Sequence, residues 1–84
     1  MNGYILRRVG GSNFLIDTKV VSEPYRDPLC INDMGALIYT YLEQGKDKDA
    51  IIETLSKEYG ASRREIAQDL SLFLERLRGF GVEV

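Results

Sequence analysis

The stretch that decides the fold is Leu-Cys-Ile-Asn-Asp-Met-Gly-Ala-Leu-Ile-Tyr, residues 29–39. It opens with three apolar residues and continues with a helical repeat. Asn32 stands between the two, where its side chain can accept a hydrogen bond from the first turn of a helix, which stabilises the helix by about 1 kcal/mol relative to Ala. Asp33 places a negative charge at the positive end of the helix dipole. We therefore expect a strand to end and a helix to begin at Asn32.

The residues before this boundary predict three short strands. Residues 4–9 and 14–20 are rich in β-formers, and Gly10-Gly11-Ser12-Asn13 between them has the composition of a turn. The segment 22–28 holds both prolines and is predicted to be a loop, and residues 28–31 form a third strand at a sheet edge. The alternation of the second strand puts four side chains on one face: Phe14, Ile16, Thr18 and Val20.

The residues after the boundary predict three helices, over 33–44, 47–59 and 62–79. Asp47 and Ser62 are suitable N-cap residues for the second and third helices. The third helix carries an apolar stripe at helical spacing, made of Ile66, Leu70, Phe73, Leu77 and Phe80. Segregated strands and helices indicate one α+β domain over residues 1–84. The expected architecture is a winged helix-turn-helix, in which a three-stranded antiparallel N-terminal sheet is followed by three helices.

Composition narrows the function classes. The chain has 84 residues, enough for one core, and 11 basic against 13 acidic residues give a net charge of −2. An acidic balance disfavours nucleic acid as a partner. Cys30 is the single cysteine, which fits a reducing cytoplasm, and the absence of histidine removes the commonest general base and metal ligand. No apolar run reaches membrane-spanning length. We expect neither a catalytic centre nor a cofactor.

The ordered pattern of the chain resembles the PqqD-like family. Residues 29–39 are similar to its signature of an aliphatic residue, Asn, two variable positions, two small residues, a variable position, Ile and an aromatic residue. Residues 42–45 resemble the end of its first helix, residues 51–60 its second helix, and residues 65–77 the acidic and aliphatic pattern of its third. The resemblance covers about residues 4–81.

This resemblance implies a peptide recognition element for ribosomally synthesised, post-translationally modified peptides. Such a module is non-catalytic and acts as a peptide chaperone. It binds the leader segment of a precursor peptide and presents it to a modifying enzyme, often a radical enzyme that uses S-adenosylmethionine. The family implies that the leader adds as an extra strand beside the third strand, with the third helix as the other wall of the groove.

Two sets of residues are the candidate peptide-binding site. The main chain of the third strand offers unpaired N–H and C=O groups at Pro28, Leu29, Cys30 and Ile31, although Pro28 has only the carbonyl. One flank of the third helix offers small, apolar and cationic side chains, namely Arg64, Ala67, Ser71, Leu74 and Arg78. The alternative for that flank is purely structural. Its small and apolar residues would then pack against the core and its arginines would be solvated.

Two other functions are weighed against peptide binding. A winged helix-turn-helix can place its third helix in the major groove of DNA. Here, however, the basic residues of that helix are interleaved with acidic residues, so it lacks the basic face of a DNA reader. An edge strand can also pair with, or be exchanged for, its copy in a second chain, which would give a homodimer.

Overall fold

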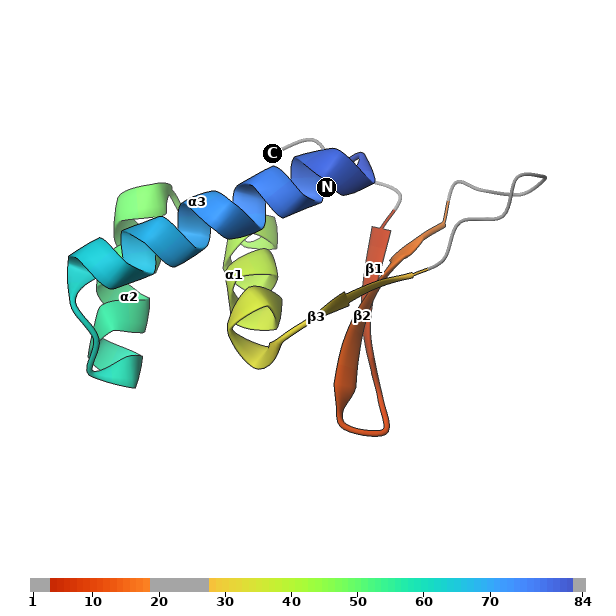
Figure 1. The fold of residues 1–84 in the computed structure, drawn as a ribbon, viewed down its shortest axis with the longest axis horizontal. Helices are drawn as coiled ribbons and strands as arrows, with labels where there is room; N and C mark the ends of the chain where they lie inside the picture. The colour runs from red at the N-terminus through yellow and green to blue at the C-terminus, as the bar shows by residue number, and fades with distance from the viewer. Residues whose placement is uncertain (1–3, 19–27, 83–84) are drawn as a thin grey trace.

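The computed structural model describes residues 4–18 and 28–82, and it has the predicted order of elements. Three strands precede three helices, which confirms the α+β architecture (Figure 1). The elements are β1 (Tyr4–Val9), β2 (Ser12–Asp17), β3 (Leu29–Ile31), α1 (Asp33–Glu43), α2 (Lys48–Tyr59) and α3 (Arg63–Phe80). The predicted segments 19–20 and 22–27 lie outside the described residues.

The sheet is antiparallel, with strand order β1-β2-β3. Gly10 and Gly11 have φ angles of +58° and +83°. A type I′ turn, which joins two strands through a two-residue loop, requires positive φ at both of these positions. The prediction that Ser12 and Asn13 belong to the turn is wrong. Two glycines suffice to reverse the chain, so Ser12 and Asn13 instead begin β2.

The face of β2 that packs against the helices differs from the predicted apolar face. Leu15 is fully buried and Asn13 is 5% exposed, whereas Phe14 and Ile16 point to the other face and are half-buried. Both faces of this strand carry apolar side chains. Which of them enters the core is decided by the side on which the helices pack, and a strand pattern alone does not contain that information.

The three predicted N-cap residues are confirmed, and α2 and α3 begin one residue after their caps. In each case the side-chain oxygen of the cap residue accepts a hydrogen bond from the N–H three residues further on, at 2.7 Å for Asn32, 2.8 Å for Asp47 and 3.1 Å for Ser62. These are local contacts between neighbours in sequence, which is why the sequence predicts them well.

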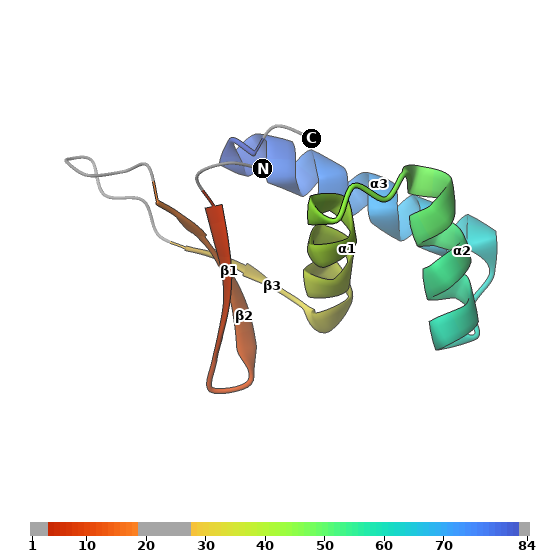
Figure 2. The same ribbon diagram turned by 180° about the vertical axis from the view of Figure 1, so that it is seen from behind.

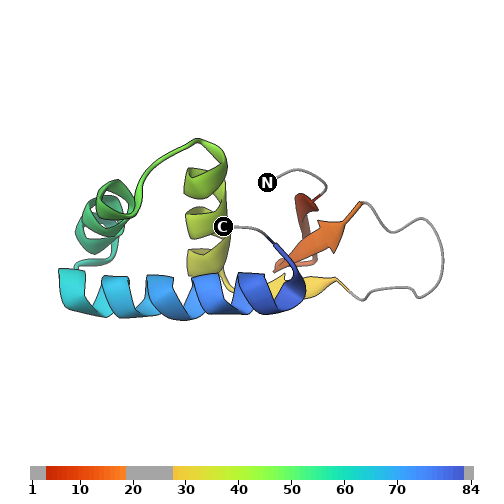
Figure 3. The same cartoon turned by 90° about the horizontal axis from the view of Figure 1, so that it is seen from above.

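The helices are arranged around α3, the longest element. Figures 1 and 3 show α1 and α2 lying against one side of α3, with the sheet beyond α1, next to the C-terminal end of α3. The sheet is joined to that end because the Tyr4 hydroxyl donates a hydrogen bond of 3.0 Å to the carbonyl of Gly81. In the reverse view, β1 is the strand on the near side of the sheet (Figure 2). In that view α3 lies on the far side of the molecule, so β3 is the edge strand nearer to α3 (Figures 2 and 3).

The core lies between α3, α1, α2 and the inner face of the sheet. Its buried apolar side chains are Leu15, Ile31, Ile38, Tyr39, Ile51, Leu55, Ile66, Leu70, Phe73, Leu74, Leu77 and Val82. The predicted stripe of α3 is confirmed, except that Phe80 is only half-buried. Burial, together with the nearby carboxylate of Glu43, raises the pKa of the Tyr39 hydroxyl to about 12. None of the helices in the described part of the chain is long and apolar enough to cross a bilayer.

Candidate functional site

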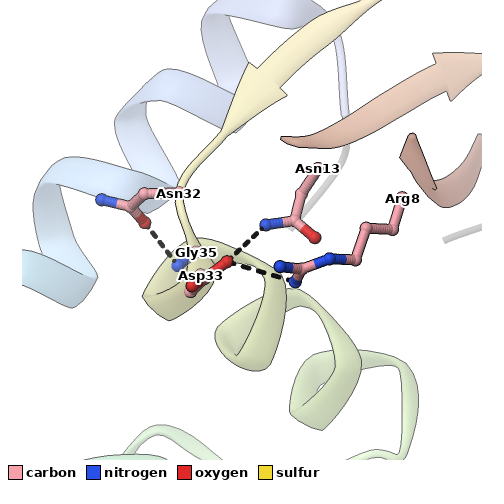
Figure 4. A network of polar contacts seen from close by, with 5 residues as sticks. All are labelled: Arg8, Asn13, Asn32, Asp33 and Gly35. Carbon is pink, nitrogen blue, oxygen red and sulfur yellow. Dashed lines mark hydrogen bonds and ion pairs between the residues drawn. The ribbon is translucent and has the colours of Figure 1, made fainter. Parts of the chain in front are cut away.

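A polar network holds the boundary between β3 and α1 in place (Figure 4). Asp33, in the first turn of α1, accepts a hydrogen bond of 2.9 Å from the buried side-chain amide of Asn13 and lies 3.4 Å from the guanidinium of Arg8. These contacts tie the β1–β2 hairpin to the start of α1. From the sequence alone, Asp33 is predicted only to interact with the helix dipole, because its partners are 20 and 25 residues away along the chain.

The outer edge of β3 faces α3. Arg76 of α3 donates a hydrogen bond of 3.0 Å from Nη2 to the main-chain carbonyl of Cys30, and both residues are exposed. Since α3 lies on the β3 side of the sheet (Figure 3), Arg76 approaches Cys30 from the side that β2 does not cover. In an antiparallel strand the N–H and C=O of one residue point to the same side. The main chain of Cys30 is therefore directed to the edge of β3 with which no other strand of residues 4–18 and 28–82 pairs, which we call the open edge.

A groove of about 370 Å³ continues from this edge between the start of α1 and α3. Its walls are Asn32, Met34, Gly35 and Ile38 on one side and Asp69, Leu72, Phe73 and Arg76 on the other. Gly35 permits the close approach of the two helices. A Cβ atom at this position would stand 2.8 Å from Cε1 of Phe73. The site is thus an open strand edge that leads into a groove.

The chemistry of the groove changes along α3. Its middle is apolar, because Leu72 is 59% exposed there and Phe73 lies beside it. Arg76 stands at the end nearer to β3, and Asp69 stands two helical turns away at the other end. Asn32 uses its Oδ1 atom for the helix cap, which fixes the orientation of the amide that lines the groove. The arrangement suits an extended chain with apolar and charged side chains.

The groove lies on the flank of α3 opposite to the predicted one. At about 100° per residue, Asp69, Leu72 and Arg76 follow one side of the buried stripe, which we call the groove flank. The predicted set lies on the other side, the opposite flank, and none of its members lines the groove. Of that set, Arg64, Ser71 and Arg78 are exposed, Ala67 is half-buried and Leu74 is buried.

The apolar residue of the predicted set, Leu74, is 4% exposed and packs in the core, as the structural alternative for that flank expects. The peptide-binding role of the predicted set stays a prediction. Leu72 is not among the site residues predicted from the sequence, although one signal for it is present: it is a large apolar residue of α3 outside the buried stripe.

The predicted strand residues meet at the open edge with different exposure. Pro28 and Cys30 are exposed, Leu29 is half-buried and the side chain of Ile31 is buried at 3%. Burial of the Ile31 side chain anchors β3 to the core. A ligand at this edge would therefore contact the main chain of β3 more than its side chains.

Two comparisons with known proteins give matches. The family model of coenzyme PQQ synthesis protein D (PqqD) matches residues 29–82, which include β3 and all three helices. Among solved structures, the chain is similar to TbiB1 in complex with the TbiA(beta) leader peptide, with 19% sequence identity and a TM-score of 0.76. That match covers 100% of this chain and 96% of TbiB1.

A search of curated proteins finds no significant match. The structural likeness, at this low identity, supports the fold. The family model covers more than half of the chain and thus carries the assignment. The chain belongs to the PqqD family.

Proposed function

We propose that the protein is a non-catalytic module that binds the leader segment of a ribosomally synthesised precursor peptide. The observation that carries the proposal is the open edge of β3, which leads directly into the groove between α1 and α3. The peptide adds to β3 as a fourth strand and continues along the groove. Membership of the PqqD family and the similarity to TbiB1, whose structure contains a leader peptide, support this function.

The two parts of the site have different tasks. Main-chain hydrogen bonds to β3 supply affinity largely without regard to peptide sequence, since every residue except proline offers an N–H and a C=O. The groove discriminates between peptide sequences, because Leu72 and Phe73 can bury apolar side chains of the leader there. The polar network around Asp33 links the β1–β2 hairpin to the start of α1, which forms one wall of the groove.

We further propose that the bound leader is presented to a separate modifying enzyme of the radical S-adenosylmethionine class. The resemblance to the family supports this partner. The module works in the cytoplasm, where ribosomes make the precursor. No contact among the described residues favours the DNA-binding alternative, and α3 has acidic and basic residues interleaved along its length. Pairing of β3 with a second copy would compete with the leader for the same edge.

Amide chemical shifts would test the proposal. The reading frames beside the coding sequence are searched for a short precursor peptide, and isotope-labelled protein is titrated with the synthetic leader of that precursor. We expect shifts at the amides of β3 and of α3 between Asp69 and Arg76. A response confined to α2 would place the peptide elsewhere and overturn the proposed site. Binding of random duplex DNA that weakens as salt is added, without any response to the leader, would overturn the function.

One main-chain substitution tests strand addition itself. Cys30→Pro removes an N–H that faces the open edge, so the affinity for the leader should fall about fivefold or more, which corresponds to one lost hydrogen bond. Cys30→Ser keeps the N–H and is the matched control, with affinity close to that of the unchanged protein. Equal affinity of the two folded variants would show that the leader does not pair with β3 at this residue.

A further inference from the structure

Resting on the proposed function, we infer that Arg76 and Asp69 select the leader by the order of its charges. The segment that binds should carry an acidic side chain at the end paired with β3 and a basic side chain at the far end of the groove. Between them an apolar side chain faces Leu72 and Phe73. The peptide class is thus an extended segment with the order acid, apolar residue, base.

The first step concerns Arg76. Its guanidinium is held by a neutral acceptor, the Cys30 carbonyl, at 3.0 Å. Among residues 4–18 and 28–82, no carboxylate forms an ion pair with it. Arg76 is therefore a cation at the edge of the site whose charge is not compensated within the described structure.

The second step is an exchange of partners. A peptide that adds to β3 offers its own N–H to the Cys30 carbonyl and competes with Arg76 for that acceptor. Once displaced, the guanidinium needs another acceptor. An acidic side chain of the peptide supplies one in a charge-assisted and often bidentate form, which is stronger than a bond to a neutral carbonyl. A peptide without an acidic residue there loses this compensation.

The third step concerns the other end. Asp69 lies on the same flank, seven residues before Arg76, which is about 10 Å along a helix axis. It has no cationic partner among the described residues either. An extended chain advances about 3.3 Å per residue, so 10 Å corresponds to about three or four peptide residues. The two charges of the groove thus define both the order and the spacing of charges in the peptide.

A selection experiment tests the inference without a known precursor. A library of displayed, randomised 12-residue peptides is selected on the intact protein and, in parallel, on Arg76→Glu, Asp69→Lys and the control Lys48→Glu, which changes an exposed residue of α2 away from the groove. We expect the unchanged protein and Lys48→Glu to enrich peptides with an acid and a base three or four residues apart around an apolar residue. Arg76→Glu should replace the acid preference by a base preference, and Asp69→Lys should do the reverse at the other position.

Synthetic peptides from the selection give the quantitative test. The affinity of an enriched peptide should fall about tenfold for Arg76→Glu and recover when its acidic residue is replaced by Lys. Thermal unfolding of each variant establishes that it is folded, and Arg76→Gln provides a neutral substitution. Peptides enriched without any charge order, yet bound at β3 and α3, would overturn the inference while leaving the proposed function intact. If no peptide is enriched at all, the peptide-binding function fails and the inference with it.

Discussion

The two flanks of α3 resemble each other in composition and differ in what they face. Each carries an apolar residue, an arginine and small or acidic side chains beside the same buried stripe. On the groove flank, Leu72 is 59% exposed and Arg76 reaches the main chain of β3. On the opposite flank, Leu74 is 4% exposed and lies in the core. The difference shows that the surroundings of a helix, and not its own pattern, decide which apolar residue meets a ligand.

The largest expected effect comes from the opposite flank and concerns stability. Leu74→Ala removes a buried side chain and leaves a cavity, so the free energy of unfolding should fall by about 2–5 kcal/mol. Urea denaturation followed by circular dichroism measures this loss. Leader affinity, measured where the variant is still folded, should stay close to that of the unchanged protein. A stable variant with weakened leader binding would indicate that the peptide binds at the opposite flank.

A pair of neighbouring substitutions compares the flanks directly. Leu72→Asp puts a charge into the apolar middle of the groove, and we expect leader affinity to fall about tenfold as burial of an apolar contact is lost. Ser71→Asp adds the same charge one residue away on the opposite flank, where it should leave binding nearly unchanged. Calorimetric titration of both proteins with one leader peptide measures the difference. Equal losses would mean that the groove does not select the ligand.

The smallest effect concerns the wall that the groove flank faces. Gly35→Ala places a Cβ atom 2.8 Å from the ring of Phe73, which must shift. Overpacking of this kind costs about 1–3 kcal/mol, and the better helix propensity of Ala returns about 1 kcal/mol. We therefore expect the free energy of unfolding, measured by urea denaturation, to fall by about 1 kcal/mol. The control Gly79→Ala, whose Cβ would meet open space in α3, should be neutral or stabilising. A stabilised Gly35→Ala protein would show that Phe73 moves freely.

Local signals explain which features of the fold could be predicted from the sequence. Each helix start is stabilised by a hydrogen bond between residues three positions apart. The glycine pair of the hairpin supplies the positive φ angles of its own turn. The elements and their order could be predicted for this reason. The site could be predicted only in part. The open edge of β3 follows from its place as the last strand, whereas the groove depends on Gly35 and Phe73, which are 38 residues apart in the chain.

The chain by itself determined the strands, the caps, the buried stripe of α3 and the class of function that its family implies. The tertiary structure decided three matters: the inward face of β2, the burial of Leu74 and the flank of α3 that meets the open edge. Each of these depends on the direction in which one element packs against another. A helix with apolar residues on both sides of its stripe satisfies the same periodicity whichever side it turns to the sheet, so only the packed structure distinguishes them.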